Sequence, residues 1–168
     1  VQGYSENEYK PNQAATKEEF LTMLSKVKTL ERSESNYKER RNEIPLTIDN
    51  SDWSYYYIKD SLNGLSLFEK EFVLGKNPDF TQEITREEAA GILAMALDLK
   101  VDENRTANFK DINTTLHRKE IEAVYANNIM SGYNNDAFGP TNQLTRAELA
   151  AVFHKILTND LARQLIKK

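Results

Sequence analysis

Apolar residues recur with helical spacing in three closely similar segments of the chain. The segments are residues 14–27 (AATKEEFLTMLSKV), 83–97 (EITREEAAGILAMAL) and 142–157 (NQLTRAELAAVFHKIL). Apolar positions three and four residues apart line one face of a helix, so each segment is predicted to be an amphipathic helix. The residues predicted to face the core are Phe20, Leu24, Val27, Ile92, Leu93, Leu97, Leu149, Val152, Phe153 and Ile156.

The three helices share one predicted start. A threonine is followed three residues later by a glutamate, which is the pattern of a capping box. In this motif the hydroxyl accepts from the third helical amide and the carboxylate accepts from the threonine amide. Because many helices begin this way, the motif by itself predicts structure rather than function. The pairs are Thr16 with Glu19, Thr85 with Glu88, and Thr145 with Glu148.

Each capped helix is the last element of a longer repeated unit. Additional helical patterns cover residues 51–68 and 116–132, each upstream of a capped helix, and the second follows the lead-in "FKDI" that contains Asp111. The loop at Gly132 has an ungapped match at Gly3, whereas the middle unit has a shortened loop. The sequence therefore predicts two complete units preceded by the second half of another, and such units must share a core.

A basic residue follows each capping threonine: Lys17, Arg86 and Arg146. The first turn is the positive end of the helix dipole, so a cation there costs roughly 0.3–1 kcal/mol at a surface. Two interpretations are open. The cation and the free amides of the helix start bind an anionic ligand, or the cation pairs with a glutamate across the interface between units.

Composition narrows the function without deciding it. Charged residues make up 29% of the chain and the formal charge is −4, so nothing favours nucleic acid as a partner. No apolar run is long enough to cross a membrane, and no secretory leader opens the sequence. There is no cysteine, His117 and His154 lie far apart, and no catalytic set is visible. We therefore expect no metal, no cofactor and no enzymatic activity.

With "FKDI", "SGYNNDAFGP" and "LTRAEL" in order, the sequence resembles the S-layer homology (SLH) family. The resemblance covers nearly the whole chain and implies an all-α fold. Tandem helix-loop-helix repeats would be arranged with pseudo-threefold symmetry around a central helical bundle. Residues 1–168 would form one SLH-array domain: the second half of repeat 1 at about 1–45, repeat 2 at about 46–100, and repeat 3 at about 101–168.

The resemblance also implies a function, the non-covalent anchoring of a surface or S-layer protein to the Gram-positive cell wall. The implied partner is an anionic secondary cell-wall polysaccharide, often pyruvylated, at an extracellular location. Trp53 would stack on a sugar or belong to the core, and Asp111 would contact the glycan or only cap the lead-in. The alternative is a protein-interaction or lattice-forming module with degenerate glycan sites. The glycan-binding residues implied are Arg86, Arg146, Lys17, Trp53, Gly132, Tyr133 and Asp111.

Overall fold

The computed structural model describes residues 8–29, 48–49, 51–133 and 136–158. In this part of the chain the regular elements are helices, joined by loops that form isolated β-bridges. The all-α fold class is confirmed. The helices are α1 (Lys17–Thr29), α2 (Tyr55–Ser61), α3 (Leu67–Leu74), α4 (Arg86–Ala96), α5 (Arg118–Ala126) and α6 (Arg146–Thr158).

The helical pattern of residues 51–68 does not form one helix. It is divided between α2 and the start of α3, and Gly64 between them has a φ of 95°. This is a conformation that glycine adopts without strain and other residues avoid. Ser66 then opens α3 with its own capping box to Glu69. Among the described residues, the second unit therefore has one helix more than the third.

The loops before the three capped helices are joined in a closed cycle of backbone hydrogen bonds. The amide of Ala15 donates to Leu144, that of Leu144 donates to Ile84, and that of Ile84 donates back to Ala15, with N–O distances of 2.8–2.9 Å. Each of these three residues is fully buried. The cycle ties the starts of α1, α4 and α6 together, although the three helices are far apart in the sequence. The pseudo-threefold arrangement of whole repeats stays a prediction.

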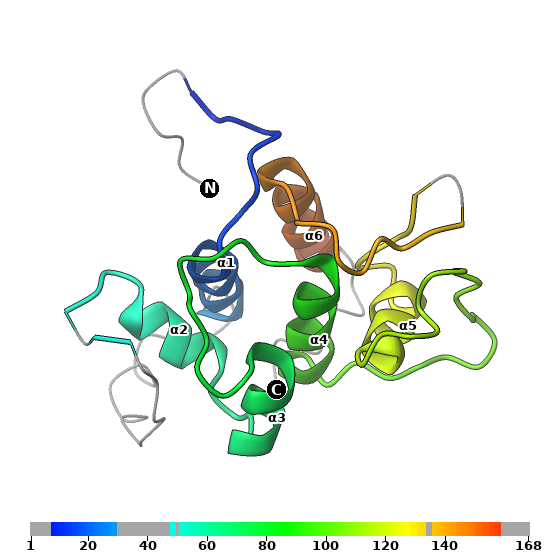
Figure 1. Ribbon diagram of the computed structural model, residues 1–168, viewed down its shortest axis with the longest axis horizontal. Helices are drawn as coiled ribbons and strands as arrows, with labels where there is room; N and C mark the ends of the chain where they lie inside the picture. The colour runs from blue at the N-terminus through cyan, green and yellow to red at the C-terminus, as the bar shows by residue number, and fades with distance from the viewer. Residues whose placement is uncertain (1–7, 30–47, 50, 134–135, 159–168) are drawn as a thin grey trace.

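The capped helices surround the middle of the molecule and the other helices pack outside them (Figure 1). α2 packs on α1, and α5 packs on α4, so each lies against the capped helix of the preceding unit. Phe20 of α1 contacts Phe153 of α6, with ring centroids 5.4 Å apart. The predicted core residues are buried. No helix among the described residues is both long and apolar enough to cross a bilayer.

Candidate functional site

The three capping boxes are formed. The glutamates accept from the threonine amides at 3.0 Å for Thr16, 2.9 Å for Thr85 and 2.9 Å for Thr145. The threonine hydroxyls accept from the glutamate amides at 3.2–3.3 Å. Each glutamate is thereby held at the start of its own helix, with its second oxygen available to another group.

That second oxygen binds the first-turn cation of another unit. Lys17 Nζ lies 3.2 Å from Glu88, Arg86 Nη1 lies 3.0 Å from Glu148, and Arg146 Nη1 lies 2.5 Å from Glu19. Together they form a second cycle around the same three helix starts. The structure thus shows the pairing interpretation of the cations, and the glutamates offset the unfavourable position of each cation on its helix dipole.

The helix-start amides are also occupied. The amide of Lys17 donates to Gln82, that of Arg86 to Asn142, and that of Arg146 to Gln13, at 2.8–2.9 Å. An anion therefore finds no row of open amides at these helix starts, contrary to the expectation of amides free to meet a ligand. Any anion site here must be built from side chains beside the helix starts.

Arg86 is enclosed almost completely by the third unit. Nε donates to the carbonyl of Phe138 at 2.8 Å and Nη2 to the carbonyl of Ser131 at 2.7 Å, in addition to the bond to Glu148. Its guanidinium lies 4.7 Å from the ring centre of Tyr133, a cation–π contact. The side chain is only 5% exposed. Arg86 thus connects the second unit to the loop and helix of the third.

A hollow of about 230 Å³ opens beside this arginine. We call it the Arg86 hollow. It lies between the segment that follows α5 and the face of α6 that carries Glu148, Ala151, Val152 and Lys155. Glu148 and Tyr133 contribute to its wall, and the Tyr133 hydroxyl donates to Glu148 at 3.2 Å. Its lining residues are Arg86, Ile129, Met130, Ser131, Gly132, Tyr133, Glu148, Ala151, Val152 and Lys155.

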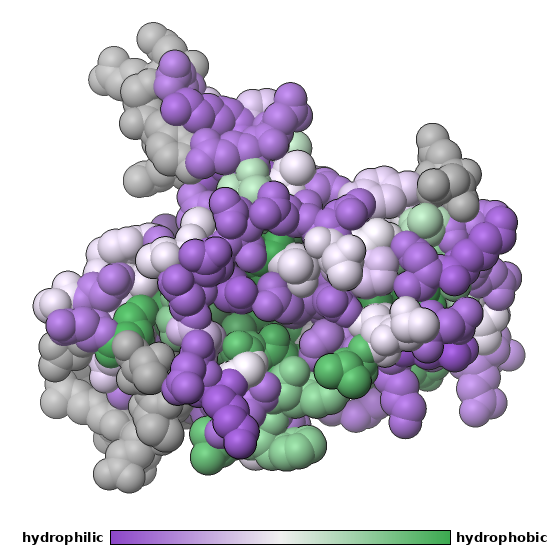
Figure 2. Space-filling view, viewed as in Figure 1, coloured by the Kyte–Doolittle hydropathy of each residue, from purple (hydrophilic) through white to green (hydrophobic). Residues whose placement is uncertain are grey.

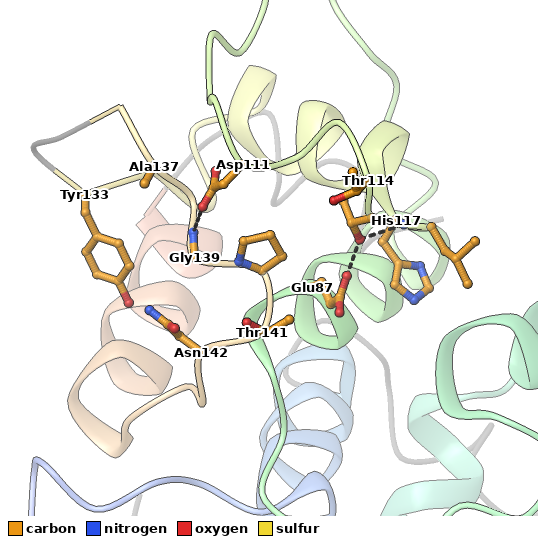
Figure 3. Close-up of a pocket in the computed structure, with 12 residues that line it drawn as sticks. Glu87, Asp111, Thr114, His117, Tyr133, Ala137, Gly139, Thr141 and Asn142 are labelled. Carbon is orange, nitrogen blue, oxygen red and sulfur yellow. Dashed lines mark hydrogen bonds between the residues drawn. The ribbon is translucent and has the colours of Figure 1, made fainter.

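A second hollow, of about 600 Å³, lies beyond Tyr133 (Figure 3). We call it the Asp111 hollow. Asp111 accepts from the amides of Phe138 and Gly139 at 2.8 and 2.7 Å, so this carboxylate fixes the loop that leads into α6. Three threonines, Tyr133 and Asn142 supply uncharged polar groups to the lining. The residues are Glu87, Asp111, Thr114, Thr115, Leu116, His117, Tyr133, Ala137, Gly139, Pro140, Thr141 and Asn142.

The carboxyl groups of Glu148 and Asp111, which line the two hollows, both have pKa values below their ordinary values. Burial acts to raise the pKa of Glu148, but hydrogen bonds from Thr145 and the charge of Arg86 outweigh it. Burial also acts to raise the pKa of Asp111, and the amides of Phe138 and Gly139 outweigh it there. Both groups are therefore ionised at neutral pH and act as hydrogen-bond acceptors only.

Of the other residues implied by the resemblance, Gly132 lines the Arg86 hollow, whereas Trp53, Lys17 and Arg146 line neither of the two hollows. Trp53 lies before α2, is 58% exposed and packs beside Tyr57, so it is a surface residue away from both hollows. Gly132 is a packing position, because a Cβ there would overlap the Phe109 ring and come within 2.7 Å of the Ala137 carbonyl. Arg146 donates to the carbonyl of Tyr9, and Lys17 is paired as described. Gly3 lies outside the described residues.

Sequence reasoning missed Lys155 in the Arg86 hollow and the double role of Glu148. Lys155 occurs late in α6 without a motif around it, so only the fold brings it near Arg86. For Glu148 a signal existed, because the cation and the capping glutamate repeat together in all three units. When a cation and a glutamate recur together at the start of each capped helix, each cation can pair with the glutamate of another unit, and the pairs can close a cycle.

Comparison with known proteins agrees with the repeated motif. The sequence profile of the S-layer homology domain matches residues 1–21 and 108–150. The chain is 35% identical over 101 residues to an S-layer protein of Bacillus licheniformis, an overlap of 58% of this chain and 11% of that protein. Both matched regions thus carry S-layer homology sequence. These matches and the S-layer relatives support a cell-surface anchoring module.

Other similar proteins are a second S-layer protein and an enzyme. S-layer protein EA1 of Bacillus anthracis is 34% identical over 90 residues, which are 51% of this chain and 10% of that protein. An endoglucanase of Bacillus sp. (strain KSM-635) is 27% identical over 150 residues, 85% of this chain and 15% of the enzyme. The chain therefore spans about an eighth of the length of these relatives.

Proposed function

We propose that this SLH module is a non-enzymatic anchor that holds a surface protein to an acidic cell-wall polysaccharide outside the cell. The observation that carries the proposal is the Arg86 hollow. It places two cations and an aromatic ring around one recess at the junction of the second and third units. Such a recess suits a glycan with a carboxylate, because charge-assisted hydrogen bonds to carboxylates are stronger than neutral ones.

Tyr133 extends this site beyond the Arg86 hollow. Its ring is 42% exposed, and it lines both hollows. Threonine hydroxyls and the Asn142 amide in the Asp111 hollow are suitable partners for the hydroxyls of an uncharged sugar. The polysaccharide would therefore place an acidic sugar beside Arg86 and a neutral neighbour across Tyr133. The pyruvate ketal implied by the family resemblance is our candidate for the acidic group.

Sedimentation with purified cell walls tests this function. The chain is mixed with walls before and after mild acid removal of pyruvate ketals, and the bound fraction is measured at increasing salt. We expect saturable binding that falls at least tenfold when the ketal is removed. Equal retention by both wall preparations would contradict recognition of the ketal. No retention by either would contradict anchoring to the wall.

A second function has specific support. All three first-turn cations are paired with glutamates of the same chain, so none of these charges is left without a partner in the protein. Large apolar side chains are exposed on and before α2 and α3, including Tyr56 at 65% and Phe68 at 76%. Such residues are typical of protein contacts. Self-association without wall material, measured by sedimentation velocity, would favour a lattice-forming module.

A further inference from the structure

The Arg86 hollow contains one cation more than its own acids neutralise. Arg86 and Glu148 form a pair, and Lys155 is the other charged residue of the lining. Within the described residues, no ion pair, hydrogen bond or ring contact involves the Lys155 ammonium. Counted over its lining residues, the hollow therefore has a net positive charge.

Lys155 also occupies a favourable position for a ligand contact. It lies in α6 one helical turn beyond Ala151, lines the hollow and is half-buried. A partly desolvated ammonium gains more from a carboxylate than a fully exposed one, because the local dielectric is lower. Arg86 differs, since its Nε, Nη1 and Nη2 already donate to protein oxygens.

The Asp111 hollow provides the contrast. Its lining contains the carboxylates Glu87 and Asp111 and neither lysine nor arginine. A carboxylate placed there meets like charge, whereas hydroxyl groups meet threonines and an amide. The two hollows thus differ in the sign of their charge on either side of Tyr133. The acidic group of a bound glycan consequently fits beside Lys155 and not beside Asp111.

We propose that Lys155 binds the carboxylate of an acidic sugar, while Arg86 positions the walls of the hollow and contacts the ligand little or not at all. This inference rests on the proposed function for the kind of ligand. A volume of about 230 Å³ is below that of a usual ligand pocket, so the hollow accommodates an acidic group with part of its ring. The carboxylate comes from a uronic acid or from a pyruvate ketal.

Two probes distinguish these sources: methyl glucuronoside and a methyl hexoside that carries a 4,6-linked pyruvate ketal. Each is titrated into the full chain, into Lys155→Met and into Lys155→Arg, and NMR shifts of the α6 amides give Kd. Lys119→Met is the matched control, because Lys119 is exposed on α5 and lines neither hollow. We expect Lys155→Met to weaken binding of the preferred probe at least about tenfold. The arginine and Lys119 variants should stay within about twofold.

The outcomes separate this inference from the anchoring function. Equal probe binding by the chain and Lys155→Met overturns the role of Lys155, even if cell walls retain both proteins. Failure of both probes to bind also overturns it. Binding that depends on Lys155, together with no retention by cell walls, supports the carboxylate site and contradicts anchoring. Equal losses in Lys119→Met and Lys155→Met would mean that net charge alone attracts the probe, and would also overturn the role of Lys155.

Discussion

Arg86 is a structural residue in the first place. It donates hydrogen bonds to two backbone carbonyls and to Glu148, all in the third unit, and its side chain is 5% exposed. Removing Arg86 would leave Glu148 without its partner and the carbonyls of Phe138 and Ser131 without these hydrogen bonds. The consequence is that a loss of wall binding in an arginine variant would not by itself identify a ligand contact.

We predict that Arg86→Met lowers the free energy of unfolding by about 2–4 kcal/mol. The control is Arg118→Met, which removes an exposed pair with Glu122 four residues away and should cost about 0.5 kcal/mol or less. Urea unfolding followed by circular dichroism measures both. Similar losses in the two variants would show that the enclosed guanidinium contributes no more than a surface charge.

The contributions of Glu148 and Glu18 to the free energy of unfolding should change with pH in opposite directions. The pKa of Glu148 is lowered in the folded state, so its stabilisation is complete above the ordinary value of 4.5 and is lost as pH falls through the folded pKa. Burial raises the pKa of Glu18, against a hydrogen bond from Ser54, so its ionisation opposes folding as pH rises above 4.5. These signs follow from the environments of the two carboxylates.

We predict that Glu148→Gln is destabilising at pH 7 and reduces the loss of stability between about pH 5 and pH 3. Glu18→Gln, on the same turn of another capped helix, should do the reverse and be neutral or slightly stabilising at pH 7. Unfolding free energies measured at several pH values check the pair. Parallel pH profiles for both variants would contradict the assigned environments.

The helix starts could be predicted from sequence because they depend on local residues. Thr145 and Glu148 are three positions apart, and a capping box needs nothing more distant. The partner of each cation could not be chosen, because Arg86 and Glu148 meet only after the loops join. The division between α2 and α3 was missed for a related reason. The apolar spacing continues through Gly64 and hides the break, although Gly64 and the capping-box spacing of Ser66 and Glu69 were local signals of it.

The loop between α5 and α6 depends on a glycine for packing. A Cβ at Gly132 would overlap the Phe109 ring, which also packs against Tyr125 and Phe138. We predict that Gly132→Ala lowers the unfolding free energy by about 1–3 kcal/mol through overpacking. It should also displace Tyr133 and weaken probe binding. Gly132→Ala combined with Phe109→Leu relieves the overlap with the ring but not the close approach to the Ala137 carbonyl, so we expect partial recovery of stability and binding. A double variant no more stable than Gly132→Ala would contradict the part assigned to the ring.

The whole molecule is closed by contacts between its first and last capped helices. Glu19 pairs with Arg146, and Ala15 donates to Leu144. These contacts complete two cycles that also pass through α4, so no unit can unfold without breaking bonds to both others. This predicts a single cooperative transition, although the chain consists of repeats and many repeat proteins unfold in steps.

Glu19→Gln tests this closure because its effect should reach a distant probe. Trp53 is the only tryptophan of the chain and lies before α2, outside the Glu19–Arg146 pair. We predict that the variant loses about 1–3 kcal/mol, because Arg146 is left buried without its carboxylate. The transitions seen by Trp53 fluorescence and by circular dichroism should move together by the same amount of urea. If the circular dichroism transition moved alone, α6 would be unfolding independently of the second unit, and the cycles would not make the units cooperative.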